Sequence, residues 1–321
     1  MTTTSTAEKF SIGIFSILTF IVGISVRGDS LLILSALFKQ YSSLFHQAES
    51  IADDFNSTST KINLVSDEFS VLNFKHILWH QCVALLMSFG GFFVFGGTLN
   101  HYYHVKQKQQ ASEWKCQPHK FLSAENERHA FKLGSMNMVF ASALSGLASA
   151  CLYENGPSKL YFTITEKGWL YFIASIPVYF LVIDGLVFYA HRFFHSKYFY
   201  GRFHSWHHRY HQPVVWTALA LHPVEMLIVQ SILILPMFLV EIHVVVFVGN
   251  LVYCYYYGMT AHSGVKMTSI WPWQPPSTFH DNHHVNPNCN IGFNTIIFDW
   301  FQGTLYENDD NPKEIGPTVT D

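Results

Sequence analysis

The chain has 321 residues, of which 49% are apolar, 17% aromatic and only 13% charged. The charged share is about half of what soluble proteins usually carry, so the composition favours a membrane protein and excludes a disordered chain. The formal net charge of −3 excludes a strongly basic nucleic-acid-binding protein. Five cysteines without a C-x-x-C spacing predict neither a disulfide framework nor a zinc ribbon.

In chain order, the apolar residues fall into long runs that predict membrane helices. The first run is Phe10–Val26, which resumes as Leu31–Phe38; no small-residue cleavage site is evident near it, so we expect an anchor. Ile77–Leu99, Leu133–Tyr153 and Trp169–Ala190 are each long enough to cross about 30 Å of hydrocarbon as a helix. These runs predict an all-α integral membrane protein, a multi-span helical bundle.

The last apolar segment, Met226–Met259, carries Glu241 and His243 near its middle. A single span would place both polar groups at the centre of the bilayer, which is costly. We therefore expect two shorter half-spans that turn near Pro236–His243.

Basic residues near the ends of the spans predict their orientation. Residues 101–132 hold six Lys or Arg, whereas residues 39–75 hold three, together with five acids. The first of these segments is therefore expected on the cytosolic side and the second on the lumenal side. Asn56 begins an Asn-Ser-Thr glycosylation sequon, which this orientation places in the lumen. Counting onward, everything after Trp169–Ala190 is expected in the cytosol.

Histidine is the most distinctive residue of the chain, with 19 copies, as many as Lys and Arg together. Eight of them form an H-x-x-x-H cluster and two H-x-x-H-H clusters, and these are His191 and His195; His204, His207 and His208; and His280, His283 and His284. Positions i, i+3 and i+4 of a helix share one face, so each cluster is expected to point its imidazoles at one locus. Eight imidazoles exceed the capacity of one ion and predict two metal ions.

The type of ligand does not by itself choose the metal, because imidazole suits iron, zinc, copper and nickel. A structural zinc site would usually have four ligands and be closed. A larger site at a membrane surface favours two irons with positions left open for dioxygen. A metal transporter would place its ligands in mid-span, whereas these clusters lie at the ends of spans or outside them.

Three further residues are weaker candidates. His262 lies between the last half-span and the third cluster and is a candidate ligand. His222, in His-Pro-Val-Glu, is a ligand, a partner of a ligand or the residue that starts a helix. Asp184 lies two helical turns before His191 on the same face, where it would orient a ligating imidazole or bond a neighbouring helix.

The order of these motifs resembles that of the fatty acid hydroxylase or sterol desaturase superfamily, and most of all the sterol C-5 desaturases and their relatives. The matching motifs are His191 and His195, then His204, His207 and His208, then His222-Pro223, His262-Ser263-Gly264, and His280, His283 and His284. The ending Cys289-Asn290-x-Gly292-Phe293-Asn294, Asp299 and Gly303-Thr304 also matches. The resemblance covers about residues 191–304.

Members of this superfamily are membrane di-iron enzymes. The resemblance therefore implies two iron ions held by the cluster histidines, dioxygen as co-substrate, and desaturation or hydroxylation of a sterol or related lipid. It also implies the endoplasmic reticulum membrane as the location. No His-Pro-Gly-Gly haem motif occurs in the chain, so electrons are expected from a separate cytochrome b5 and its NAD(P)H-dependent reductase.

Two alternatives remain at this point. One is a fatty-acid or sphingolipid hydroxylase of the same superfamily, and the other is a catalytically silent lipid-binding membrane protein. In each case the expected organisation is N-terminal spans and loops over residues 1–168, a domain with a cytosolic histidine-rich di-metal cap over residues 169–306, and a polar tail over residues 307–321.

Overall fold

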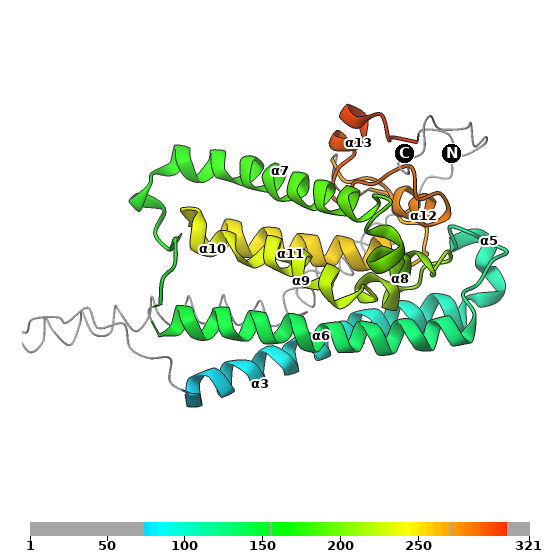
Figure 1. The fold of residues 1–321 in the computed structure, drawn as a ribbon, viewed down its shortest axis with the longest axis horizontal. Coiled ribbons are helices and arrows are strands. Elements are labelled where there is room, and N and C mark those ends of the chain that lie inside the picture. Colours follow the sequence, from blue (N-terminus) through cyan, green and yellow to red (C-terminus); the bar gives the residue numbers. More distant parts are fainter. Residues whose placement is uncertain (1–73, 155, 270, 272, 307–321) are drawn as a thin grey trace, which may run out of the picture.

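The computed structural model describes residues 74–154, 156–269, 271 and 273–306, which form a bundle of long helices (Figure 1). The expected spans at Phe10–Val26 and Leu31–Phe38, the sequon at Asn56 and the tail 307–321 lie outside these residues. Within them, four helices are long and apolar enough to cross a membrane. The prediction of an all-α membrane protein is confirmed for this part of the chain.

Short π-helical and 3-10 turns interrupt or connect the α-helices. In chain order the first described helical elements are α3 (Phe74–Gly91), η1 (Phe92–Gly96), α4 (Gly97–Leu99), η2 (Asn100–Lys106), η3 (Lys108–Gln110), α5 (Ala111–Trp114), α6 (Ala124–Tyr153), η4 (Ile164–Glu166) and α7 (Trp169–Phe194). They are followed by η5 (Tyr200–His204), α8 (Ser205–His208), η6 (Val215–Leu219), α9 (Pro223–Ile234), α10 (Pro236–Leu239), α11 (Val244–Ala261), α12 (Ser277–Val285) and α13 (Ile297–Gln302).

The first two described spans are longer than their apolar runs predicted. Helix α3 continues through π-helical turns as far as Lys106, where a ring nitrogen of His104 lies 2.8 Å from the carbonyl oxygen of Ser263. Helix α6 begins after Ser123, whose hydroxyl accepts a hydrogen bond from the backbone of Asn126. Caps and tertiary contacts therefore carry both helices beyond the hydrocarbon-like residues.

The chain turns near Glu241 and His243, where these two polar residues predicted a break in the last apolar segment. After α10, strand β2 (Ile242–His243) pairs in parallel with β1 (Leu160–Tyr161), and α11 then runs back through the bundle. Glu241 lies in this turn, exposed, with one carboxylate oxygen 2.6 Å from the ammonium of Lys167. The expected break is confirmed, but only Pro223–Leu239 is shorter than a span, since α11 is long enough to cross a membrane by itself.

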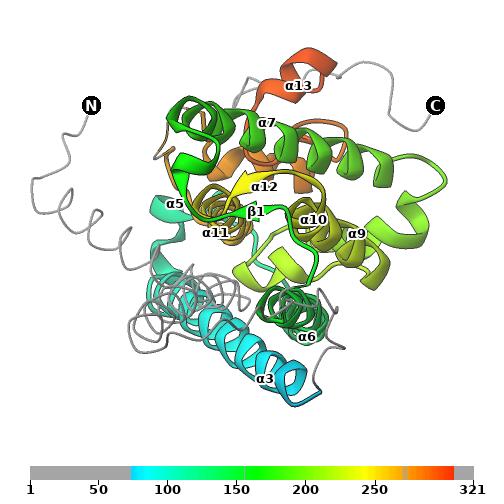
Figure 2. The same cartoon turned by 90° about the vertical axis from the view of Figure 1, so that its left-hand side faces the viewer.

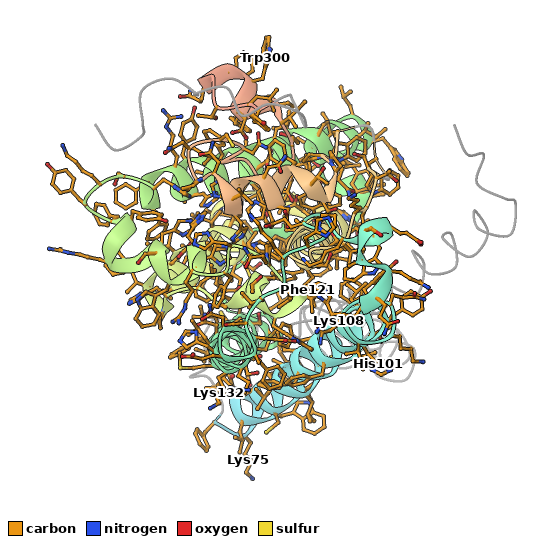
Figure 3. All side chains as sticks on the ribbon, turned by 90° about the vertical axis from the view of Figure 1, so that its right-hand side faces the viewer. Lys75, His101, Lys108, Phe121, Lys132 and Trp300 are labelled. Carbon is orange, nitrogen blue, oxygen red and sulfur yellow. The ribbon has the colours of Figure 1, made fainter. Side chains whose placement is uncertain are left out.

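In Figure 2 helix α11 lies inside the bundle, below α7, with α10 and α9 beside it and α6 further down. Two thirds of its most apolar window is buried, against 22% for α7, so α7 offers most of its surface to surrounding lipid. At one end of the bundle, α5, α8 and α12 form a cap (Figure 1). The basic segment between the first two described spans lies at this same end (Figure 3).

Candidate metal centre

The structure brings all nine candidate histidines of the cap together. They form two groups, here called the first group, His191, His195, His204, His208 and His283, and the second group, His207, His262, His280 and His284. Within each group, every pair of candidate ligand nitrogens lies within 4.8 Å. Two nitrogens on opposite sides of one ion, with bonds of about 2 Å, are about 4 Å apart, so each group has the size of a single metal site.

Each H-x-x-H-H cluster is divided between the two groups, which differs from the expectation that a cluster points at one locus. Helical residues four apart differ by about 40° around the axis, whereas neighbouring residues differ by about 100°. His204 and His208 therefore fall in the first group, while His207 falls in the second. In α12, His280 and His284 fall in the second group and His283 in the first. Each cluster thus connects both groups.

Three rings of the first group are held by hydrogen bonds at their outer nitrogens. Nδ1 of His191 lies 2.6 Å from the carbonyl oxygen of Ile291, and Nδ1 of His283 lies 2.7 Å from that of Cys289. Nδ1 of His204 lies 2.7 Å from a carboxylate oxygen of Glu225, and both side chains are buried. A carbonyl can only accept, so His191 and His283 carry their proton on Nδ1, and each Nε2 keeps a lone pair.

The second group has fewer such contacts. Nδ1 of His262 lies 2.7 Å from the carbonyl oxygen of Gly258. The Nδ1 atoms of His207, His280 and His284 meet no hydrogen-bond partner among the described residues, and neither does either ring nitrogen of His208 in the first group.

The inner nitrogens fit bound cations. Nε2 of His195 lies 3.2 Å from Nε2 of His191 and 3.1 Å from Nε2 of His283, and both of these partners present lone pairs. In the second group, Nε2 of His262 lies 3.1 Å from Nε2 of His207 and 2.9 Å from Nε2 of His280. Lone pairs converging in a buried space are unfavourable unless a cation lies between them, so both donor sets suit a metal ion.

Burial also keeps the rings in the form that binds a metal. It lowers the pKa of His262 to about 4, and it lowers the pKa values of His280 and His284 well below their usual range. At neutral pH these imidazoles are therefore uncharged, and each has a lone pair to donate.

Two weaker candidates take other places. His222 lies outside both groups and caps α9, where its Nδ1 accepts a hydrogen bond from the backbone of Val224. Asp184 holds no imidazole: its carboxylate accepts hydrogen bonds from the backbone of Asn294 and the hydroxyl of Thr295. It therefore fixes the non-helical segment after α12 against α7, which is neither of the two roles expected for it.

Two carboxylates that support the histidines were not singled out from the sequence. Glu225 contacts His204 directly. Asp299 accepts hydrogen bonds from the backbone amides of Ile291 and Gly292 and from the hydroxyl of Thr304. It thus holds the carbonyl that binds His191. Both residues belong to motifs that carry the resemblance. Each is an acid among apolar residues, and this feature of the sequence could have identified them as functional candidates.

A largely apolar cavity opens against both groups. It reaches His191, His204, His207, His262 and His280 at one end, and it extends along α9 and α11 to the residues Val229, Leu233, Cys254 and Tyr255. From Glu225 to Leu233 the helix rises about 12 Å, so the cavity is deep enough to hold several carbons of a lipid beyond the histidines.

Comparison with known families agrees with this geometry. Residues 176–304 match the fatty acid hydroxylase family, a region that holds all nine histidines and both supporting carboxylates. The predicted resemblance to the fatty acid hydroxylase superfamily is therefore confirmed for residues 176–304.

The curated relatives include proteins that act on sterols. The chain is 28% identical to a Delta(7)-sterol 5(6)-desaturase of Schizosaccharomyces pombe, over 49% of this chain and 56% of the relative. It is 28% identical to lathosterol oxidase of Mus musculus, over 47% and 52% of the two chains. A very-long-chain aldehyde decarbonylase of Oryza sativa is 29% identical over 42% and 54%.

These matches thus span about half the length of each relative. No solved structure matches the chain.

Proposed function

We propose that this chain is a membrane-bound oxidoreductase that uses two iron ions and dioxygen to desaturate or hydroxylate a sterol or related lipid. The observation that carries the proposal is the meeting of two buried imidazole groups with the end of an apolar cavity. A transporter needs a polar path across the membrane, whereas this cavity is lined mainly by aliphatic and aromatic side chains.

The histidines of the first group would hold one ion and those of the second group the other. When bound, two irons supply the activation of dioxygen that attack on an unactivated C–H bond requires. The residues of the chain do the rest. Carbonyls and Glu225 keep the protons of His191, His204 and His283 on the outer nitrogens, so that the inner nitrogens face the ions.

The cavity would select and position the lipid. Met226, Val229 and Leu233 of α9 line it together with Met259 of α11 and Phe293, so an apolar substrate would displace water from the space beside the histidines. The names of the relatives in Schizosaccharomyces pombe and Mus musculus support a sterol as the substrate.

The proposed enzyme also needs a membrane location and a source of electrons. Residues 169–306 would form the catalytic domain, in the endoplasmic reticulum membrane, with the histidines on the cytosolic side. The common end of the histidines and the basic segment 101–132 supports this orientation (Figure 3). Each turnover needs two electrons besides those of the substrate, and cytochrome b5 with its NAD(P)H-dependent reductase would supply them.

A lipid mass profile tests the proposal. The full chain and its His283→Ala variant are expressed in a yeast strain that lacks its sterol desaturase, and sterols and other lipids are compared by mass. We expect a sterol lighter by two hydrogens, or heavier by one oxygen, with the intact chain alone. The first product would define a desaturase and the second a hydroxylase.

Two results would decide against the proposal. An oxidised fatty acid or sphingolipid in place of a sterol would make the chain a hydroxylase of those lipids. An unchanged lipid profile, together with purified protein that retains no iron, would leave a lipid-binding protein without catalysis.

A further inference from the structure

A segment outside the family-matched region packs directly on the metal-binding cap. Residues 111–117, here called the strap, follow the first described span and run beside the segment after His262. The backbone of Cys116 donates to the carbonyl of Gly264 at 2.9 Å, and that of Lys266 donates to the carbonyl of Trp114 at 2.6 Å. The strap is therefore fixed to the cap by its main chain.

Gly264 shows how close the two segments approach. Its φ is +71°, and a Cβ added there would lie 2.5 Å from the carbonyl oxygen of Pro213 and 3.5 Å from the ammonium of Lys115. Only glycine combines this conformation with this spacing, so the residue two after His262 is suited to receive the strap.

One side chain of the strap joins two histidine-bearing segments. The amide of Gln117 donates to a carboxylate oxygen of Asp281 at 2.9 Å and to the carbonyl oxygen of His211 at 2.8 Å. Asp281 lies in α12 directly after His280, and His211 follows three residues after His208. A single amide thus links α12 to the end of the second histidine cluster.

The strap also places a buried charge beside α12. The side chain of Lys115 is fully buried and its ammonium has no hydrogen-bond partner among the described residues, although it lies 5.4 Å from the centre of the Phe121 ring. Asp281 is also buried, and one of its oxygens is unpartnered. Burial lowers the pKa of Lys115, and the nearby charge of Asp281 opposes this shift, so the two buried side chains interact although no hydrogen bond joins them.

Helix α12 is the element on which both metal groups depend, because it supplies His283 to the first and His280 and His284 to the second. Its rotation about its axis would move both sets of ligands at once. We propose that Gln117 and Lys115 are positioning residues that fix this rotation through Asp281. The role of the strap in metal retention rests on the function proposed above, whereas its hold on α12 does not.

Two measurements on the full-length protein test the proposal. The first is the rate at which a chelator removes iron, and the second is amide hydrogen exchange of α12 in the metal-free protein. We expect Gln117→Ala to release iron about tenfold faster and to speed exchange in α12, because the helix loses its link to His211. Lys115→Met, of similar length, should do the same, since it leaves the buried Asp281 carboxylate without a counter-charge.

A double variant separates the charge interaction from general damage. Lys115→Met combined with Asp281→Asn removes both charges, and we expect its iron release to be slower than that of Lys115→Met alone. The matched control is Gln109→Ala, an exposed glutamine of the preceding turn, which should behave as the parent protein. Exchange in α6 should stay unchanged in all variants.

The outcomes that overturn the proposal are distinct from those that overturn the function. If Gln117→Ala and Lys115→Met keep the exchange of α12 and the iron release of the parent, the strap does not position the helix. If the double variant releases iron no more slowly than Lys115→Met alone, the Lys115–Asp281 interaction is not the cause. A parent protein that binds no iron overturns the metal site, and exchange in α12 still tests the strap.

Discussion

The two histidine groups present the same donor atoms but differ in what lies behind the rings. In the first group a carboxylate and two backbone carbonyls hold three of the five imidazoles. In the second group only His262 is held in this way, by a backbone carbonyl, and the outer nitrogens of His207, His280 and His284 meet no partner among the described residues. Three of the five rings of the first group therefore have a fixed orientation, against one of the four rings of the second.

This difference matters because an outer hydrogen bond fixes the orientation of an imidazole and raises its basicity. Glu225 adds a side-chain contact of this kind from another helix. We therefore expect the first group to bind its ion more tightly, and the second to be the more adaptable site. Four predictions test this comparison, beginning with a metal ligand and ending with a residue two contacts away from the ion.

The largest effect is expected when a ligand of the better-held group is removed. His283→Ala should reduce lipid oxidation at least ~100-fold, because the first group loses a ligand whose ring is fixed by the carbonyl of Cys289. Product mass and iron content are measured on membranes that contain equal amounts of protein. His119→Ala, an exposed histidine outside both groups, is the control. Full activity of His283→Ala would show that the group assignment is wrong.

Much of this site could be predicted from the spacing of the histidines. Clusters with i, i+3 and i+4 spacing at the end of an apolar run predict imidazoles on adjoining helix faces, and eight such residues require two ions. The division of each cluster between two ions also follows from the 100° between neighbouring residues. The expectation that each cluster points at one locus ignores this angle, because it treats positions i+3 and i+4 as the same side of the helix.

The supporting contacts could not be predicted in this way, because they join residues far apart in the chain. Glu225 meets His204 from another helix, and Asp299 acts on His191 only through the backbone at Ile291. The membrane spans also combine features that the sequence predicts with features that depend on distant residues. Apolar runs located α6 and α7, whereas the continuation of α3 as far as Lys106 is accompanied by a contact between His104 and the distant Ser263.

The second prediction removes the carboxylate that distinguishes the first group. Glu225→Ala should lower iron affinity or activity about 10–100-fold, since His204 loses the partner that orients it. Glu225→Gln keeps an accepting oxygen without the charge and should lie between this variant and the parent. Iron titration of the purified proteins measures the effect, with exposed Glu113→Gln as the control for charge. Equal affinities for all of them would remove the basis for ranking the groups.

The third prediction concerns the order of metal release. A chelator should remove the two ions in separate phases, with the second group losing its ion about tenfold faster. In Glu225→Ala the slow phase should approach the fast one, because His204 of the first group then lacks the side chain that orients it. Iron remaining on the protein is followed over time. Release of both ions in one phase from the parent protein would mean that the cap opens as a unit.

The smallest effect is expected from Asp299, two contacts away from the ion. Its carboxylate receives the amides of Ile291 and Gly292 together with the Thr304 hydroxyl. Asp299→Asn keeps one accepting oxygen but turns an amide donor toward another donor, which loosens the carbonyl that orients His191. The slow phase of iron release should accelerate less than about tenfold, while the fast phase should not change. Acceleration of both phases would show that Asp299 stabilises the cap as a whole rather than the first group, because the second group has no contact with this backbone segment among the described hydrogen bonds.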